Sequence, residues 1–517
     1  MTNDNISPLT KFVTLNFWKS LSPETVLRFK DGGVDVSRIK EISSEELPII
    51  GQVPSSNLLR VNLKDETGNI IWPGCIKTYE FSHMVDSVQK KQSAQSLDPF
   101  YQVLQSDFCN RRYLPVTKIY AKETLEIKDK DDKRKKNLSN LLMDFWPEPS
   151  LDLHFFYLES LIENYMEKMI DPKFKDDLEV QEKLKSGINE IKKLKTELFK
   201  SAIDTILEFA IYGTYFKKYG NEKDRNHDIF KLMPDEKECL SVKKAQDMGR
   251  YALLYKEIMD DSITFADIKQ NNIPASIQKK SDEISSGLEK LVPVLMKPLL
   301  DEDKRVYQQG DETLNHFVYR QFNNIKKMGV LDLCRAREDN LAVPLTKLLL
   351  GYLQNLNHKE VDELLNYAVQ KKAGLEEIFK EEIGADELKV HIPLEENEFK
   401  GAFDMNSIYE LWKQAGRIAY FYAFEDEDKS ENYTKNIAMA MKKYDPKYLH
   451  SFNNSLSLPQ EINFRTRLPK EQLITTLSLL RERMDSIGEA KYIDDKEKKD
   501  VADFCTIFKK YMTLKSS

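Results

Sequence analysis

The stretch DLEVQEKLKSGINEIKKLKTELFKSAIDTILEFAIYGTYFKKY, residues 177–219, indicates the fold class because its apolar residues recur every three or four positions. The apolar stripe consists of Leu184, Ile188, Ile191, Leu194, Leu198, Ala202 and Ile206. That spacing predicts a single helix with one apolar face. At 1.5 Å per residue the helix would be roughly 60 Å long.

The two halves of this helix differ in how much of their surface is apolar. Off the stripe the first half is polar, as in a coiled coil or a helix flanked by solvent. The second half, from Ala202 to Phe216, is apolar on more faces, so we expect it to be buried. Gly187 predicts either a kink or a close approach by a neighbouring element.

Helical patterns continue through most of the chain beyond this stretch. We expect further helices at Val242–Asp260, Ala275–Val294, Asp311–Lys327, Asn340–Gln354 and Lys359–Ile383. Pro469 has the place of a first helical residue before a stripe of Leu473, Leu477, Leu480 and Met484. Glycine is scarce, with 18 of 517 residues, which disfavours the glycine-rich turns of doubly wound sheets. The sequence therefore predicts a mostly α, multidomain protein.

The N-terminal part has a different pattern, and we interpret residues 1–126 as a small α+β domain. Apolar and polar residues alternate from Asn57 to Phe81 around Thr67-Gly68-Asn69, which predicts a hairpin. Residues 127–137, IKDKDDKRKKN, have no apolar residue after the first, which favours a charged linker over a basic contact site. Residues 138–385 would then form a helical domain, and residues 386–517 a C-terminal helical domain.

Charge and cysteine content exclude several classes of protein. The net charge of −7 argues against a general nucleic-acid binder, which needs a basic surface. The five cysteines are far apart and never form a C-x-x-C pair, so we expect reduced thiols in the cytosol. No run of about 18 apolar residues exists, so the sequence predicts no transmembrane segment. Oligomeric state does not follow from the sequence.

Acidic residues 425–428 end an apolar run that begins near Ile408. The run has a helical stripe, which we expect to start just after Asp404 or Asn406, so the acids would lie in a solvated turn between two helices. The alternative is a divalent-metal site built on Asp426 and Asp428, since hard cations bind clustered carboxylates. We expect the turn and do not favour a bound divalent cation; any other cofactor stays unknown.

His391 and Glu395 are the candidate catalytic pair, four residues apart with Pro393 between them. A histidine beside a carboxylate can act as a general base. The structural alternative is a loop histidine. His154 lies on a strongly apolar segment, which predicts a core or boundary residue. The sequence contains no G-x-x-x-x-G-K-[ST], G-x-G-x-x-G or G-x-S-x-G motif.

The C-terminal tail YMTLKSS, residues 511–517, has Leu514 fourth from the end and finishes on Ser516 and Ser517. Together with a composition rich in Lys, Glu and Asn, this tail resembles type IV-secreted effectors of intracellular bacteria. Asp494, Asp495, Glu497 and Asp500 form an acidic block further upstream than in those tails. The resemblance implies delivery into a host cell by a bacterial secretion system and action on host proteins or membranes.

Three functional hypotheses follow from these patterns. The first is a secreted or cytosolic helical effector that binds and modulates partner proteins, including host proteins. The second is a metal-assisted transferase that modifies a protein substrate through acidic residues. The third is a structural cytoplasmic protein. Whether the protein is an enzyme stays open at the level of sequence.

Overall fold

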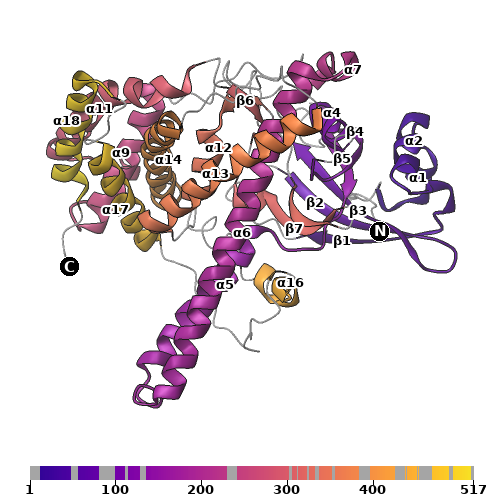
Figure 1. Cartoon of the computed structure of the whole chain (residues 1–517), viewed down its shortest axis with the longest axis horizontal. Helices are drawn as coiled ribbons and strands as arrows, with labels where there is room; N and C mark the ends of the chain where they lie inside the picture. Colours follow the sequence, from indigo (N-terminus) through magenta and orange to yellow (C-terminus); the bar gives the residue numbers. More distant parts are fainter. Residues whose placement is uncertain are drawn as a thin grey trace.

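The computed structural model describes most of the chain. The described residues are 12–47, 56–80, 99–110, 114–128, 135–229, 241–301, 305–310, 313–322, 325–331, 337–351, 356–383, 396–424, 437, 439–450, 452, 469–487 and 493–513. A five-stranded antiparallel sheet forms the N-terminal unit, and helices form most of the remainder (Figure 1). The predicted fold class, mostly α with a small α+β N-terminal domain, is confirmed.

The N-terminal sheet has the strand order β1-β2-β3-β5-β4. Its strands are β1 (Glu41–Leu47), β2 (Ser56–Lys64), β3 (Ile70–Glu80), β4 (Ile119–Lys128) and β5 (Lys135–Asp144). Helix α4 (Pro99–Asn110) lies in the chain between β3 and β4. The predicted hairpin is present: Gly68 turns the chain at a φ of 82°, and the Asp65 carboxylate accepts the backbone N–H groups of Thr67 and Asn69.

The prediction of a charged linker at residues 127–137 is wrong at both of its ends. Ile127 and Lys128 belong to β4, and Lys135, Lys136 and Asn137 belong to β5, which pairs with both β4 and β3. Strand β5 continues to Asp144, so the sheet unit extends past residue 126. A dense charge run is compatible with strand ends when both strands reach beyond the core at the solvent end of a hairpin. Residues 129–134 lie outside the described part.

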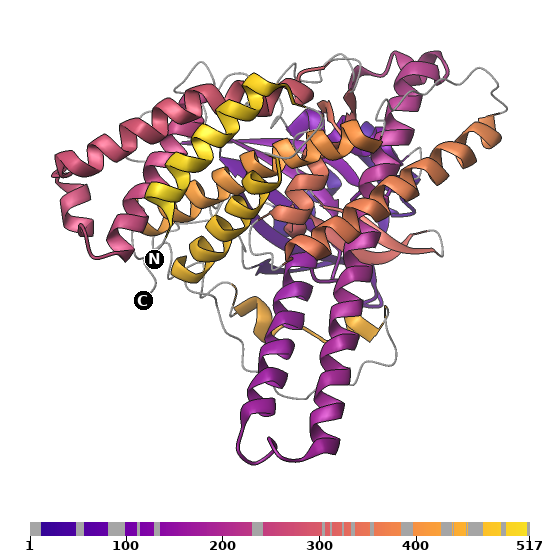
Figure 2. The same cartoon turned by 60° about the vertical axis from the view of Figure 1, so that its left-hand side comes forward.

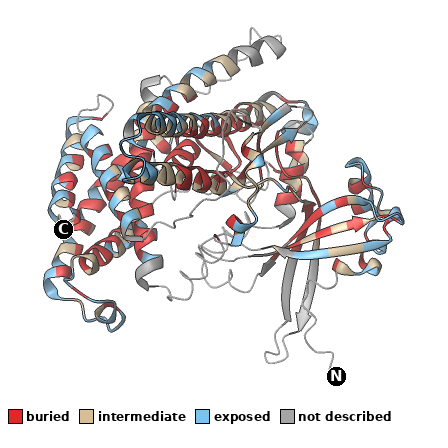
Figure 3. Cartoon of the chain, turned by 90° about the horizontal axis from the view of Figure 1, so that it is seen from below, coloured by how far each residue is buried: buried red, intermediate tan, exposed pale blue. Residues whose placement is uncertain are grey.

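Two hydrophobic clusters cover the two faces of this sheet. Figure 3 shows buried residues along its strands. On the outer face, α1 (Leu15–Lys19) and α2 (Pro23–Asp31) bury an aromatic cluster in which the Phe29 and Tyr120 rings stack at 4.2 Å. Trp72 packs edge-on to both rings and donates a 2.9 Å hydrogen bond to the Asp144 carboxylate. Burial raises the pKa of Asp144, although this hydrogen bond opposes the rise. The inner face joins the main cluster of the helical unit.

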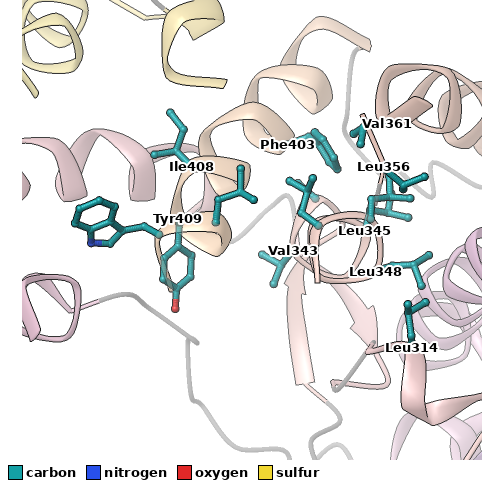
Figure 4. Packing of buried hydrophobic residues seen from close by; sticks show 14 of the residues in the cluster. Leu314, Val343, Leu345, Leu348, Leu356, Val361, Phe403, Ile408 and Tyr409 are labelled. Carbon is teal, nitrogen blue, oxygen red and sulfur yellow. The ribbon is translucent and has the colours of Figure 1, made fainter. Parts of the chain in front are cut away.

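The helical unit is built around one long helix and one fully buried helix. Its main elements are α5 (Leu151–Ile170), α6 (Leu178–Tyr219), α7 (Glu222–Arg225), α9 (Val242–Met259), α10 (Phe265–Lys269), α11 (Ala275–Met296), α12 (Ala342–Leu350), α13 (His358–Ile383), α14 (Glu396–Phe424), α16 (Lys447–His450), α17 (Pro469–Ile487) and α18 (Asp495–Met512). All nine residues of α12 are buried. Figure 4 shows Val343, Leu345 and Leu348 directed from α12 into the core, with Phe403 of α14 nearby.

The predicted helices at 177–219, 242–260, 275–294, 340–354 and 359–383 are present with boundaries shifted by a few residues. The expected stripe of α17 is buried. Helix α14 packs against α9, α12 and α17. The described helices on both sides of the boundary expected at residue 386 therefore share one core. No helix of the described residues is long and apolar enough to cross a bilayer.

The helix expected at Asp311–Lys327 is wrong. This region forms the 3-10 turn η6 (Leu314–His316) and the hairpin of β7 (Phe317–Phe322) and β8 (Ile325–Val330). The aromatic and β-branched residues of the segment FVYRQF favour a strand, and the Asn323-Asn324 pair between the strands is typical of a turn. A separate two-stranded antiparallel sheet pairs β6 (Arg305–Gln308) with β9 (Arg337–Asn340), with β7 and β8 between them in the chain.

Ile206→Asp is expected to lower the free energy of unfolding by more than about 4 kcal/mol, because Ile206 is 2% exposed and an aspartate there would be a buried, unpaired charge. Lys193→Asp is the matched control on the same helix. Lys193 is exposed, so its substitution should stay within about 0.5 kcal/mol. Chemical denaturation of both variants checks this, and equal losses would mean that the buried face of α6 is assigned wrongly.

Candidate active site between the sheet and the helical unit

The residues proposed from sequence as site residues lie outside the described part of the chain. His391 and Glu395 precede the start of α14, and Asp426 and Asp428 follow its end. The run from Ile408 is helical as expected, but α14 begins at Glu396, so neither Asp404 nor Asn406 caps it. Among the described residues, no group of three or more His, Cys, Asp or Glu side chains is arranged to hold a metal.

His154 is buried, as predicted, and has a structural role. Its Nδ1 lies 2.6 Å from the Tyr444 hydroxyl, and the Tyr157 ring stacks on Tyr444 at 4.7 Å. Burial lowers the pKa of His154 to about 3, so the imidazole is neutral at physiological pH. The three cysteines in the described part, Cys75, Cys109 and Cys505, are all buried free thiols.

Lys77 is one of three basic side chains that the sheet directs toward the helical unit; the others are Arg60 of β2, opposite Cys75, and Lys122 of β4, opposite Leu141. Side chains alternate along β3, so Trp72 and Ile76 face the outer cluster, whereas Cys75 and Lys77 face the inner one. Lys77 is half-buried and lies opposite Leu141 of β5. Burial raises the pKa of the Cys75 thiol to about 12, and the Lys77 ammonium opposes that rise. An ammonium group is thus held on the inner face of the sheet's central strand.

Helix α4 packs against β4 and β5 and is tied to the start of β4. The Ser106 hydroxyl donates to the Thr117 carbonyl at 3.0 Å and accepts from the Ile119 N–H at 2.8 Å. Gln105 is fully buried, and neither atom of its amide has a hydrogen-bond partner. The only carboxylate in the sequence of α4 is Asp107. The helix therefore presents amides rather than acids to the interior.

The two short two-stranded sheets of the helical unit, β6–β9 and β7–β8, lie against α4 and the N-terminal sheet. The Cys109 sulfur of α4 is 3.9 Å from the Tyr307 hydroxyl of β6. The backbone of Val330 at the end of β8 hydrogen-bonds to Thr117 at 3.0 Å and to Pro115 at 2.8 Å. Cys109, Tyr307 and Val330 belong to the hydrophobic cluster that includes Cys75. Cys75 lies two residues before Lys77, on the same face of β3. The inner face of the sheet, α4 and the ends of β6 and β8 thus converge.

A buried ion pair fixes the chain at the end of β6. The Arg337 guanidinium, on β9, donates to the Asp339 carboxylate at 3.0 Å and to the Gly310 carbonyl at 3.2 Å. Arg337 is 5% exposed and Asp339 is 8% exposed. Gly310 has a φ of 103°, a conformation that side chains strain, so a glycine is required there. This arrangement holds the backbone immediately before Asp311 in the sequence.

Asn315 lies on η6 and is exposed. Its Oδ1 accepts from the Thr313 hydroxyl at 2.7 Å. Asp311 follows Gly310 in the sequence, and Asp332 follows Leu331, the first residue after β8; both aspartates lie outside the described residues. Lys77 and this segment were not among the site residues predicted from the sequence. The signal that could have found them is Gly310-Asp311 with Asn315 four residues after the aspartate.

No family model and no curated protein matches the chain. Among solved structures, it is similar to an ethanolamine kinase of Plasmodium vivax, with a TM-score of 0.37 and 10% identity over 86% of this chain and 89% of that one. A spectinomycin phosphotransferase in complex with ADP and spectinomycin has a TM-score of 0.37 and 10% identity, over 82% and 94% of the chains. A microcompartment-associated aminopropanol kinase has 0.36 and 9%, over 84% and 99%. TM-scores this far below 0.5 carry no argument about activity or substrate.

Proposed function

We propose that the chain is a phosphotransferase that moves the terminal phosphoryl group of a nucleoside triphosphate to an acceptor. The observation that carries the proposal is Lys77 on β3, on the sheet face that is directed toward α4 and the two short two-stranded sheets. Protein kinases hold the nucleotide phosphates with a lysine on the third strand, and the helix after that strand supplies its partner. Helix α4 follows β3 in this chain.

The segment from Gln309 to Asp332 supports the same proposal. Kinases carry a catalytic aspartate followed by a metal-binding asparagine in one loop, and a second metal-binding aspartate after the next pair of strands. Here Asp311 and Asn315 precede β7, and Asp332 follows β8 in the sequence. This order of residue types around a described hairpin is the order found in protein kinases.

The donor set fits a triphosphate with a divalent cation. Lys77 offers an ammonium for phosphate oxygens, and Asn315 offers an exposed amide oxygen of the type that hard cations accept. A bound cation supplies charge neutralisation of the phosphoryl group. In the transfer, the bond from the terminal phosphorus to its bridging oxygen breaks and a bond to the acceptor oxygen forms. The acceptor's proton passes to the carboxylate that we assign to Asp311.

Three departures from the kinase pattern favour nucleotide binding without turnover as the second candidate function. Gln309 stands where kinases have the histidine of H-R-D, and three residues rather than four separate Asp311 from Asn315. Helix α4 has Gln102 and Gln105 buried, and it lacks the glutamate that pairs with the strand lysine in kinases. Two of these departures remove a basic or charged group from the expected catalytic set, and the third changes the spacing between two of its members.

Addition of ATP with magnesium is expected to raise the melting temperature of the full chain by about 3 °C at a hundredfold excess over the dissociation constant. The reason is that a ligand that binds only the folded state stabilises that state. Differential scanning fluorimetry with ATP, GTP and CTP, each with magnesium or manganese, measures the shift, and adenosine is the control without phosphates. No shift with any triphosphate would contradict both candidate functions. Phosphate release distinguishes them, since only a transferase hydrolyses the nucleotide.

A further inference from the structure

The distal ends of α5 and α6 form an arm that projects from the body of the molecule (Figure 2). We define the arm as residues 162–193. Its tip exposes Met166 (56%), Ile170 (75%), Phe174 (37%) and Leu178 (80%). These are four of the twelve exposed large apolar side chains among the described residues, gathered within thirteen positions. Exposed apolar residues that cluster in this way mark an interaction surface.

Below the tip, the arm buries its apolar stripe only in part. Leu184 and Ile188 remain half-exposed, whereas Leu198, nearer the body on the same helix, is fully buried. The two helices are already close, because a side chain in place of Gly187 would contact the Tyr165 ring at 2.5 Å. Closer packing within the arm therefore cannot cover the stripe. Two helices enclose a single seam, and a core with all sides covered requires a bundle of about four.

The charges of the arm are complementary between its two helices. Residues 163–171 of α5 and its C-cap carry three carboxylates and one lysine, Glu163, Glu167, Asp171 and Lys168. The part of α6 inside the arm, residues 178–193, carries four lysines and three glutamates, Lys183, Lys185, Lys192, Lys193, Glu179, Glu182 and Glu190. The net charges of the two segments are therefore opposite in sign. A two-fold axis that sets α5 of one copy beside α6 of another brings acid against base twice. Such an interface is self-complementary by symmetry.

We propose that the arm is a dimerisation surface and that its occupant is a second copy of this chain, the two arms forming a four-helix bundle. A lipid surface fits the charges less well, because carboxylates outnumber lysines from Met166 to Leu178 and cell membranes present anionic headgroups. The proposal does not rest on phosphoryl transfer. The sequence predicted a protein partner, and for the arm we propose that this partner is a second copy of the chain.

The test measures the molar mass of the full chain by light scattering after size-exclusion chromatography, at about ten micromolar. The wild type is expected to be a dimer, and the double variant Ile170→Glu, Leu178→Glu a monomer, with dissociation at least 100-fold more favourable. Both side chains are exposed in the monomer, so the two substitutions should not themselves lower the melting temperature of the folded monomer. Leu27→Glu is the matched control, since Leu27 of α2 is 56% exposed, and this variant should remain a dimer.

A second measurement tests the charge pairing. Glu163→Lys with Glu167→Lys should weaken the dimer, and the addition of Lys183→Glu with Lys185→Glu should restore it. A monomeric wild type would overturn the proposal. A dimer that persists in the Ile170→Glu, Leu178→Glu variant would also overturn it. Flotation of a monomeric wild type with phosphatidylcholine–phosphatidylserine vesicles would overturn it in favour of a lipid surface.

Discussion

Lys77→Met is expected to lower the release of phosphate from magnesium–ATP by about 10²–10³-fold, because it removes the one charge that β3 directs toward the inner face of the sheet. Water is the acceptor in this assay, so the natural acceptor need not be known. Methionine matches the length and apolar stem of lysine, and the melting temperature without nucleotide should change little.

Lys64→Met is the matched control for this experiment. Lys64 lies on the neighbouring strand β2 and makes a 2.7 Å ion pair with Glu41, which is largely exposed. Its loss should leave phosphate release unchanged, since surface ion pairs contribute little. A Lys77 variant with wild-type phosphate release, or equal losses in both variants, would contradict the assignment of Lys77.

Arg337→Ala is expected to lower the free energy of unfolding by about 3–5 kcal/mol, because the Asp339 carboxylate would stay buried without its partner. The Gly310 carbonyl would lose the hydrogen bond from Arg337 in the same variant. We therefore expect phosphate release to fall as well, since this hydrogen bond holds the backbone just before Asp311. Urea denaturation and the phosphate assay measure the two effects on the same preparation.

The double variant Arg337→Met, Asp339→Leu separates stability from positioning. Replacing a buried ion pair with apolar residues of similar volume often costs little, so the double variant should recover most of the lost stability. It still lacks the hydrogen bond from residue 337 to the Gly310 carbonyl, so its phosphate release should stay low. A double variant as unstable as Arg337→Ala would show that the buried charge is not the cause. Full recovery of phosphate release would show that the hydrogen bond to Gly310 does not position the chain.

Periodicity predicted the helices well where one side of each helix faces the core. Ile191, Leu194 and Leu198 are buried on one face of α6, as their spacing predicts. The hairpin around Gly68 was equally clear, since the turn residues and the alternation agree. The same reasoning failed at β7 and β8, because Phe317 and Val318 are both buried and the strand does not alternate. Short apolar runs of this kind do not distinguish strand from helix.

The candidate site was not predictable from local patterns because its parts are far apart in the sequence. Lys77 lies on β3 and Gly310 follows β6. These two elements share one hydrophobic core, in which Cys109 of α4 contacts Tyr307 of β6. A lysine within an ordinary strand sequence carries no signal of its own. The Asp311–Asn315 spacing and Gln309 also depart from the kinase motif, so a search for that motif does not find them.

Several predictions from the sequence remain predictions. The catalytic pair His391–Glu395 and the metal site at Asp426 and Asp428 lie outside the described residues. Leu514 and the two terminal serines of the effector-like tail also lie outside them. A cytosolic location, secretion into a host cell and the binding of host proteins therefore stay proposals that rest on composition and on this tail.

The assignment of the inner sheet face to a nucleotide is tested by labelling the full chain with an ATP analogue that carries a sulfonyl fluoride in place of the terminal phosphates. Such a reagent modifies a lysine that lies beside the phosphate position. We expect mass spectrometry of the peptides to find the label on Lys77 and excess magnesium–ATP to prevent it. Label spread over surface lysines such as Lys64, at a level that ATP does not change, would contradict the proposed nucleotide site.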